Sequence, residues 1–467
     1  MKIHAIRLRH ACHFSDLKVE LNPDQPVTLI IGEQASGKTT LLKSMFHALS
    51  WFPARFKDLR SPGIVMPDQD IMYKRVQSEI EIEVDIPVEI GPLSESTDAR
   101  SINTFRCQWQ LYKTLNAAGV GISKVELEPL EQLVANYLKA IKQDPMQGLP
   151  LIAFYPTERF VNEISLLNKN NPHIFQSATA YEAVPLAFTT FSRFFEWLRE
   201  ISDVENAQTA QTFQQILANR KQSKLTSTTP DTSLLADALL HASTQMHTPA
   251  LTALRTTLQT VIPDITDLFI EYQPRLQLMV IYKGQTIQFL QLSNSFKNLV
   301  AMLGDIVRRM CLLNPLSLYP CIEGDGILMI DELDAQLDDS YSLGVLERLH
   351  HAFPRVQIIA TSQRNALLET AEQYQCFLLQ DKTISPIQLN DQQQQFQQIY
   401  ADLLSNHSTS DQNIETESAL ENTEINVSEH NVTELFQKIH SMNPDEKLML
   451  LDLLRADHDP TPHSPLN

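Results

Sequence analysis

The sequence predicts an α/β fold built on a mixed central sheet, and two widely separated segments carry that prediction. Residues 29–42 read LIIGEQASGKTTLL, in which an apolar run leads into a glycine-rich turn and then into a helical pattern. Residues 327–334 read ILMIDELD, an apolar run that ends in acidic residues. Such short apolar runs are typical of strands that are buried on both faces of a parallel sheet.

The glycine-rich turn has the pattern G-x-x-x-x-G-K-[ST] between an expected strand and an expected helix, which is the context that a phosphate-binding loop requires. Its glycines let successive backbone N–H groups converge on an anion at the helix N-terminus. We expect Lys38 to reach the β- and γ-phosphates and Thr39 to bind Mg²⁺. The alternative is a plain glycine turn with a solvated lysine. The expected nucleotide contacts are Gly32, Glu33, Gln34, Ala35, Ser36, Gly37, Lys38, Thr39 and Thr40.

The acidic segment supplies the second half of such a site. Asp331 is expected to hold Mg²⁺, and Glu332 to orient or deprotonate the attacking water. A core strand ending in a solvated acidic loop is the simpler alternative. Together the two segments predict ATP and Mg²⁺ as cofactors and ATP hydrolysis as the reaction.

Length and composition limit the remaining possibilities. A chain of 467 residues with 43% hydrophobic content accommodates two or three domain-sized units of an ordinary globular protein. No stretch approaches the roughly 20 apolar residues of a membrane span, and the N-terminus lacks a signal-peptide pattern. We therefore expect a cytoplasmic protein without membrane contact. The five scattered cysteines are expected to be reduced core thiols.

The net charge of −19 argues against a surface that coats nucleic acid without specificity. It leaves room for a local basic groove, so DNA is retained as a candidate partner. The competing interpretation is a solvated face beside a core edge. The candidate groove combines Arg55, Lys57, Arg60, Lys74 and Arg75 with Trp51, Phe52 and Phe56.

Periodicity gives the order of the remaining elements. Strands are expected over 2–21 (two strands), 27–31, 78–90, 104–115, within 149–160, 268–287 (two strands), within 327–334, 355–362 and 376–380. Helices are expected over 39–49, 126–142, much of 180–243, 251–263, 295–313 and 340–352. The alternation in 78–90 and 104–115 predicts an antiparallel sheet with one solvated face.

The long separation between the phosphate loop and the acidic strand, with antiparallel strands near both, favours one kind of P-loop NTPase. It fits the ABC-type ATPase head of the RecF and SMC class. We expect a head over 1–390, with an antiparallel and P-loop lobe (1–160), a helical insertion (161–260) and a signature and Walker B lobe (261–390). A flexible acidic linker is expected over 391–432, and a short helical tail over 433–467.

Six segments, spanning roughly residues 1–365, carry a resemblance in a consistent order. They are LIIGEQASGKTTLL, LIAFYPTERF, FSRFFEWLREISDVENA, LQLSNSFKNLVAMLGDIVRRMCLLNP, GILMIDELDAQLD and FPRVQIIATSQ. The chain resembles the bacterial family described as predicted ATP-binding proteins involved in virulence, relatives of the Septu defence ATPase PtuA. The resemblance implies two heads that pair head-to-tail around nucleotide, with Ser293 of one head capping the nucleotide of the other.

The residues leave alternatives open at several of these positions. Ser293 also fits a plain helix N-cap. Arg159 matches a family arginine near the nucleotide, but a surface ion pair explains it equally well. Gln363 stands where the family usually has a histidine, Ser295 where it has a glycine, and Gln336 where a histidine is common, so hydrolysis is expected to be slow.

Three functions are compatible with the sequence. The first is an ATP-driven regulator of a separate effector, such as a nuclease, in an anti-phage module. The second is a DNA-repair ATPase that acts on DNA directly. The third is an ATP-binding scaffold that barely hydrolyses. The tail over 433–467 is expected to dock on its own head, on a sister subunit or on another protein.

Overall fold

The computed structural model describes most of the chain up to residue 387. The described residues are 1–93, 105–161, 180–181, 191–223, 248–335, 337–364, 367–368 and 374–387. The expected linker, the expected tail and Gln336 lie outside them, as does part of the expected helical insertion. The structural statements below concern the described residues.

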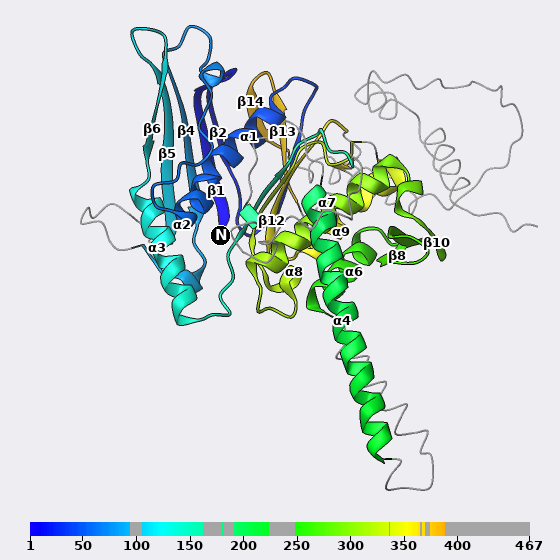
Figure 1. Ribbon diagram of the computed structural model, residues 1–467. Helices are drawn as coiled ribbons and strands as arrows, with labels where there is room; N and C mark the ends of the chain where they lie inside the picture. Colours follow the sequence, from blue (N-terminus) through cyan, green and yellow to red (C-terminus); the bar gives the residue numbers. More distant parts are fainter. Residues whose placement is uncertain are drawn as a thin grey trace, which may run out of the picture. The chain divides into compact units, whose positions relative to one another are not determined.

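A six-stranded sheet forms the centre of the fold, in the order β14-β13-β3-β12-β11-β7 (Figure 1). All neighbouring pairs are parallel except β14 with β13, so the sheet is mixed, as the sequence predicts. Its parallel strands end on one edge, which brings the segments that follow them together. The strands are β3 (Val27–Ile31), β7 (Leu151–Tyr155), β11 (Gly326–Ile330), β12 (Val356–Ser362), β13 (Gln375–Gln380) and β14 (Thr383–Pro386).

A five-stranded antiparallel sheet, ordered β2-β1-β4-β5-β6, makes up the first lobe. Its strands are β1 (Lys2–Ala11), β2 (Phe14–Glu20), β4 (Gln77–Asp85), β5 (Arg106–Leu115) and β6 (Gly121–Glu126). In β4 every second residue is buried, which confirms the predicted one-sided sheet. Helix α3 (Glu128–Gln143) packs on β5, and α2 (Trp51–Lys57) packs on α3. Strand β6 was not predicted from the sequence, because this edge strand is largely exposed and lacks alternation.

Helices and a small sheet complete the described part of the fold. The helices are α1 (Lys38–Leu49), α4 (Ser192–Ser223), α6 (Pro249–Val261), α7 (Asn294–Leu313), α8 (Pro320–Glu323) and α9 (Asp339–Ala352). A three-stranded antiparallel sheet contains β8 (Ile265–Glu271), β9 (Gln277–Tyr282) and β10 (Gln285–Gln288). Short 3₁₀ turns cover Asp68–Asp70, Val88–Ile90 and Phe289–Gln291. The predicted strand over 78–90 therefore ends early, at Asp85.

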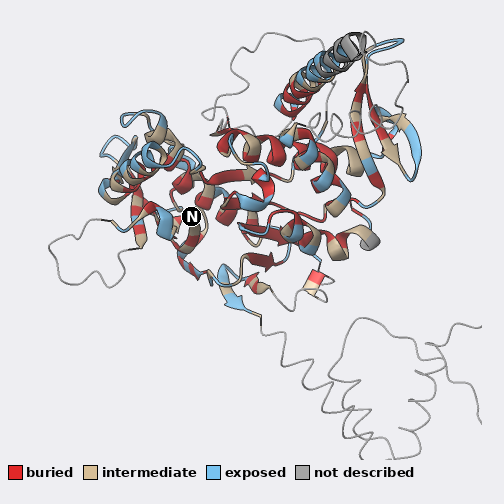
Figure 2. Cartoon of the chain, turned by 90° about the horizontal axis from the view of Figure 1, so that it is seen from below, coloured by how far each residue is buried: buried red, intermediate tan, exposed pale blue. Residues whose placement is uncertain are grey.

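Buried residues follow the central strands and the helix faces that cover them (Figure 2). Helix α7 is deeply buried, since residues from Leu299 to Leu313 are mostly buried and it packs against α6, α4 and β7. None of the helices in these described ranges has the length and apolar content needed to cross a membrane.

One buried glutamine joins the two larger sheets. The Gln357 side chain on β12 accepts a hydrogen bond from Ile3 N at 2.7 Å and donates to Ile3 O at 3.0 Å. Gln357 is fully buried, so these bonds satisfy backbone groups of β1 that water does not reach. The amide thereby fixes β1 against β12.

We predict that Gln357→Leu lowers the free energy of unfolding by about 2–4 kcal/mol, because it leaves a buried N–H and a buried C=O unpaired. Urea denaturation measures this. Gln375→Leu is the matched control, since Gln375 makes the same kind of clamp on Asn22 N and Glu20 O at the exposed surface. Its cost should stay below about 1 kcal/mol. Equal losses in the two variants would contradict the assigned role of Gln357.

Candidate nucleotide-binding site

The phosphate loop connects β3 to α1, as the sequence predicts, and close contacts explain both of its glycines. A Cβ at Gly32 would lie 2.4 Å from the Leu379 carbonyl oxygen. Gly37 has a φ of +111°, and a Cβ there would lie 2.3 Å from Nε2 of His13. Both positions are therefore closed to larger residues by the surrounding chain.

Lys38 begins α1 and lies against the loop that precedes it. Its Nζ donates to the carbonyls of Gly32 at 2.5 Å and Glu33 at 2.8 Å. Burial lowers the pKa of Lys38, while the nearby charges of Glu332 and Asp331 oppose that shift. The ammonium group thus lies within the curve of the loop, beside two carboxylates.

Asp331 is fully buried and accepts hydrogen bonds from three threonine hydroxyls. Thr39 donates to Oδ2 at 2.7 Å, Thr157 to the same atom at 3.0 Å, and Thr361 to Oδ1 at 2.7 Å. A buried carboxylate is tolerated only when such donors surround it. The structure therefore brings together Thr39 and Asp331, the two residues that the sequence assigned to Mg²⁺.

Glu332 and Gln363 also meet at this edge of the sheet. The Gln363 side-chain amide donates to Oε1 of Glu332, and the Glu332 backbone N donates to Oγ1 of Thr361 at 2.8 Å. The backbone of Glu332 has a φ of +44°, in the left-handed region that residues other than glycine rarely adopt. Its carboxylate is consequently held beside Gln363 by the backbone as well as by the amide.

Arg159 lies inside the protein, so the alternative of a surface ion pair is wrong. Its guanidinium donates to the carbonyls of Pro156 at 2.8 Å, Asp331 at 2.6 Å and Glu332 at 2.9 Å. Burial lowers the pKa of Arg159 to about 10, although Asp331 and Glu332 favour the charged form. The side chain thus ties the segment after β7 to the segment after β11.

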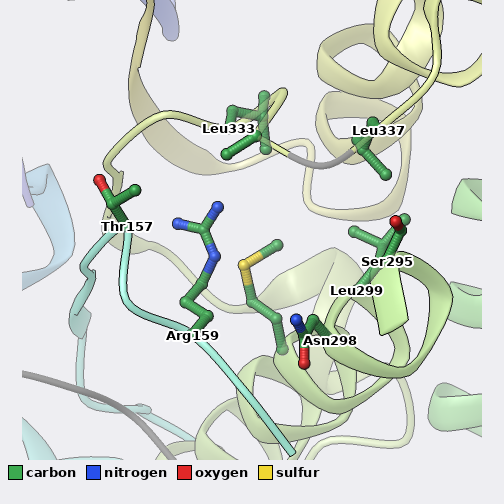
Figure 3. A pocket seen from close by; sticks show the side chains of 9 residues that line it. Thr157, Arg159, Ser295, Asn298, Leu299, Leu333 and Leu337 are labelled. Carbon is green, nitrogen blue, oxygen red and sulfur yellow. The ribbon is translucent and has the colours of Figure 1, made fainter. Parts of the chain in front are cut away.

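Ser293 is the exposed N-cap of α7 and accepts a hydrogen bond from Phe296 N at 3.3 Å. The next residues of α7, Ser295 and Asn298, line a small cavity whose opposite wall includes Thr157 and Arg159 (Figure 3). The N-cap interpretation is therefore observed within one chain. A contact of Ser293 with a second copy stays a prediction.

Two residues beside the site escaped the sequence analysis. His13, in the turn between β1 and β2, packs its ring 4.4 Å from that of Phe14 and lies against Gly37. Burial and the charge of Lys382 lower its pKa. Thr157 is the second residue after the end of β7. Only their position in the chain could have pointed to these two residues, since each lies where a strand ends near the phosphate loop.

The basic and aromatic cluster near α2 is built into the fold only in part. Trp51 and Phe52 are buried. Arg55 lies over the Trp51 ring at 5.4 Å and donates to the carbonyls of Leu59 and Ser61. These contacts favour the alternative of a face beside a core edge for this part of the cluster, whereas Lys57, Arg60, Lys74 and Arg75 are exposed.

Comparison with known proteins adds independent information. The sequence profile of the AAA domain family matches residues 5–265. "Retron Vc95 probable ATPase" of Vibrio cholerae serotype O1 biovar El Tor is 24% identical over 416 residues, covering 83% of this chain and 76% of the relative. "Retron Ec83 probable ATPase" of Escherichia coli is 22% identical over 414 residues, covering 82% and 72%.

A shorter match, 32% identical over 71 residues, links 15% of this chain to 9% of "Septu protein PtuA" of Bacillus mycoides (strain KBAB4). Among solved structures, the Smc head domain derived from Pyrococcus furiosus, bound to the C-terminal domain of ScpA, is 14% identical with a TM-score of 0.44, covering 85% of this chain and 99% of that one. The resemblance inferred from the six sequence segments is confirmed by the family profile and these relatives.

We predict that Arg159→Met lowers the free energy of unfolding by about 3 kcal/mol, because it leaves buried carbonyls without their charged donor. Arg7→Met is the control: it removes a guanidinium with two hydrogen bonds to Asp16 at the surface and should cost little, because exposed ion pairs add little to stability. Thermal and urea unfolding measure both. A loss for Arg159→Met no larger than that for Arg7→Met would refute the assigned role of Arg159.

Proposed function

This chain belongs to the AAA domain family, and from that premise we propose that it binds Mg²⁺-ATP, closes as a head-to-tail dimer and thereby regulates a partner effector. Its membership of the family and its relatives named as probable ATPases support ATPase activity. The observation that carries the finer proposal is the 2.7 Å hydrogen bond between the phosphate-loop threonine Thr39 and the buried carboxylate of Asp331.

The chemistry of this pair suits Mg²⁺. A hydroxyl and a carboxylate oxygen are hard ligands of the kind that Mg²⁺ prefers, and Mg²⁺ usually binds one or two carboxylates together with substrate phosphates. The described residues contain no group of three or more acidic, His or Cys side chains that could hold a metal alone. Thr39 and Asp331 would thus hold the ion, which when bound neutralises phosphate charge.

The other site residues have distinct proposed roles. Lys38, held on the loop by Gly32 and Glu33, contributes its positive charge to the β- and γ-phosphates. Glu332 takes a proton from the attacking water. Gln363 orients the Glu332 carboxylate through its amide and, unlike a histidine, cannot itself exchange a proton.

Closure would bring Ser293 and the N-terminus of α7 from one copy to the γ-phosphate held by the other. A helix N-terminus favours such an anion, and ATP then stabilises the closed dimer by contacting both heads. The retron and Septu relatives support a place in a bacterial anti-phage module. The effector proposed for that module is a separate protein such as a nuclease.

Gln363 and Ser295 favour one second candidate, an ATP-binding scaffold with little hydrolysis. Phosphate release over hours, with and without duplex DNA, separates the possibilities. We expect slow turnover that DNA does not change. Stimulation by DNA would instead point to a DNA-repair ATPase, and tight ATP binding without turnover would point to the scaffold.

We predict that Glu332→Gln reduces phosphate release by about 100-fold or more, the usual contribution of a general base, and that it elutes as a dimer with Mg²⁺-ATP. Lys38→Ala should bind nucleotide poorly and stay monomeric. Size-exclusion chromatography with light scattering measures the mass. Glu323→Gln, on α8 and bonded to Ser317, is a control that should match the wild type. An unchanged mass for Glu332→Gln with ATP would contradict nucleotide-driven dimerisation.

We further predict that Gln363→His raises turnover by about tenfold, since an imidazole supplies a group that exchanges protons near neutral pH. Steady-state phosphate release over pH 6–9 tests this prediction. Gln363→Asn keeps an amide and serves as the control. Turnover of Gln363→His at or below the wild-type rate would show that Gln363 does not limit hydrolysis.

A further inference from the structure

A buried carboxylate in the middle of α7 connects that helix to the nucleotide site. Asp305 accepts hydrogen bonds from the Tyr155 hydroxyl at 2.9 Å, Arg308 Nε at 2.9 Å and Arg309 Nε at 2.8 Å. Burial alone would raise the pKa of Asp305, but the charges of Arg309 and Arg308 hold it well below its usual range. Asp305 is therefore an anion that bonds both its own helix and β7.

Tyr155 reaches the site from its other end. It is the last residue of β7, and its carbonyl accepts a hydrogen bond from Asp331 N at 2.9 Å. The chain then continues to Thr157 and Arg159, which bond the Asp331 carboxylate and the carbonyl groups of Asp331 and Glu332. Tyr155 thus bonds α7 through its side chain and the acidic segment through its backbone.

The first turns of α7 are packed less closely against the residues that follow β7. A cavity of about 20 Å³ lies between Ser295, Asn298 and Met302 of α7 and the side chains of Thr157 and Arg159 (Figure 3). Asn298 Oδ1 accepts a hydrogen bond from Val161 N at 3.0 Å. Asp305 is held more tightly and lies further along the helix. At a rise of 1.5 Å per residue, it is about 18 Å along the helix axis from Ser293.

We propose that Tyr155 and Asp305 are positioning residues that set where Ser293 stands relative to the Asp331 and Glu332 segment of the same head. This inference rests on the proposed dimerisation around nucleotide. A rigid helix transmits a small displacement at Asp305 to its N-terminus. Loss of the Tyr155 hydroxyl therefore lets Ser293 miss the γ-phosphate of the opposite copy, while nucleotide still binds its own P-loop.

The test uses Tyr155→Phe, which keeps the ring and both arginine contacts of Asp305, so the buried charge stays paired. We expect kcat to fall about tenfold, the effect of losing one buried hydrogen bond in the transition state, with KM for ATP within about twofold of wild type. In the Glu332→Gln background, the protein concentration that gives half dimer with ATP should rise about tenfold. Tyr181→Phe is the matched control, because its buried hydroxyl bonds the Pro150 carbonyl instead of α7.

A double variant separates positioning from general weakening. Ser293→Ala should lower kcat by itself, and adding Tyr155→Phe should then cause no further loss, since both act at one contact. The inference is overturned if the effects of the two substitutions multiply in the double variant, or if Tyr181→Phe loses as much activity as Tyr155→Phe. It is also overturned if a rise in KM accounts for the defect, or if Tyr155→Phe or Ser293→Ala behaves like the wild type. If the wild type neither dimerises nor hydrolyses ATP, the proposed function fails first and the inference fails with it.

Discussion

The site depends on one unfavourable requirement: the fold places a carboxylate, Asp331, where water does not reach it. Such a charge must be surrounded by donors, and here the three hydroxyls come from the phosphate loop, the segment after β7 and the end of β12. Residues far apart in the sequence therefore have to meet at one edge of the sheet. The parallel strands β3, β7, β11 and β12 make that meeting possible by ending together.

Local signals were sufficient for the parts of the site that depend on nearby residues. The phosphate loop follows from glycine sterics, and Asp331 follows from an apolar run that ends in acids. Pairings across long stretches of chain could not be predicted in this way. Tyr155 and Asp305 are separated by 150 residues; each lies in one of the six family-like segments, but nothing in either segment predicts that the two side chains pair. His13 needed the three-dimensional contact with Gly37, and the short edge strands β6 and β14 offered too little pattern to detect.

Part of the chain's acidic charge lies on β4 of the first lobe, where the carboxylates are paired with neighbouring side chains. Intermediate-exposure acids on β4 pair with basic or polar side chains of neighbouring strands: Arg9 with Glu79, Gln108 with Glu81, and Arg106 with Glu83 and Asp85. The two arginines neutralise part of the negative charge of these four acids, and each cross-strand pair adds a small gain in stability. Since the arginines on this face already have carboxylate partners, they are poorly placed to bind a phosphate backbone as well. The lobe therefore offers DNA less positive charge than its arginine content suggests.

The left-handed backbone conformation of Glu332 explains why the acidic segment depends on hydrogen bonds from Arg159. A positive φ at a residue with a side chain is costly, and such a conformation persists only when the surroundings enforce it. Thr361 bonds the Glu332 backbone N, while Arg159 bonds the carbonyls of Asp331 and Glu332. Three backbone groups of the turn, the Glu332 N–H and the carbonyls of Asp331 and Glu332, are therefore satisfied by side chains, where a regular strand would have used a neighbouring strand. That leaves Asp331 pointing into the buried ring of hydroxyls and Glu332 pointing toward Gln363, so one strained turn gives two adjacent acids different environments.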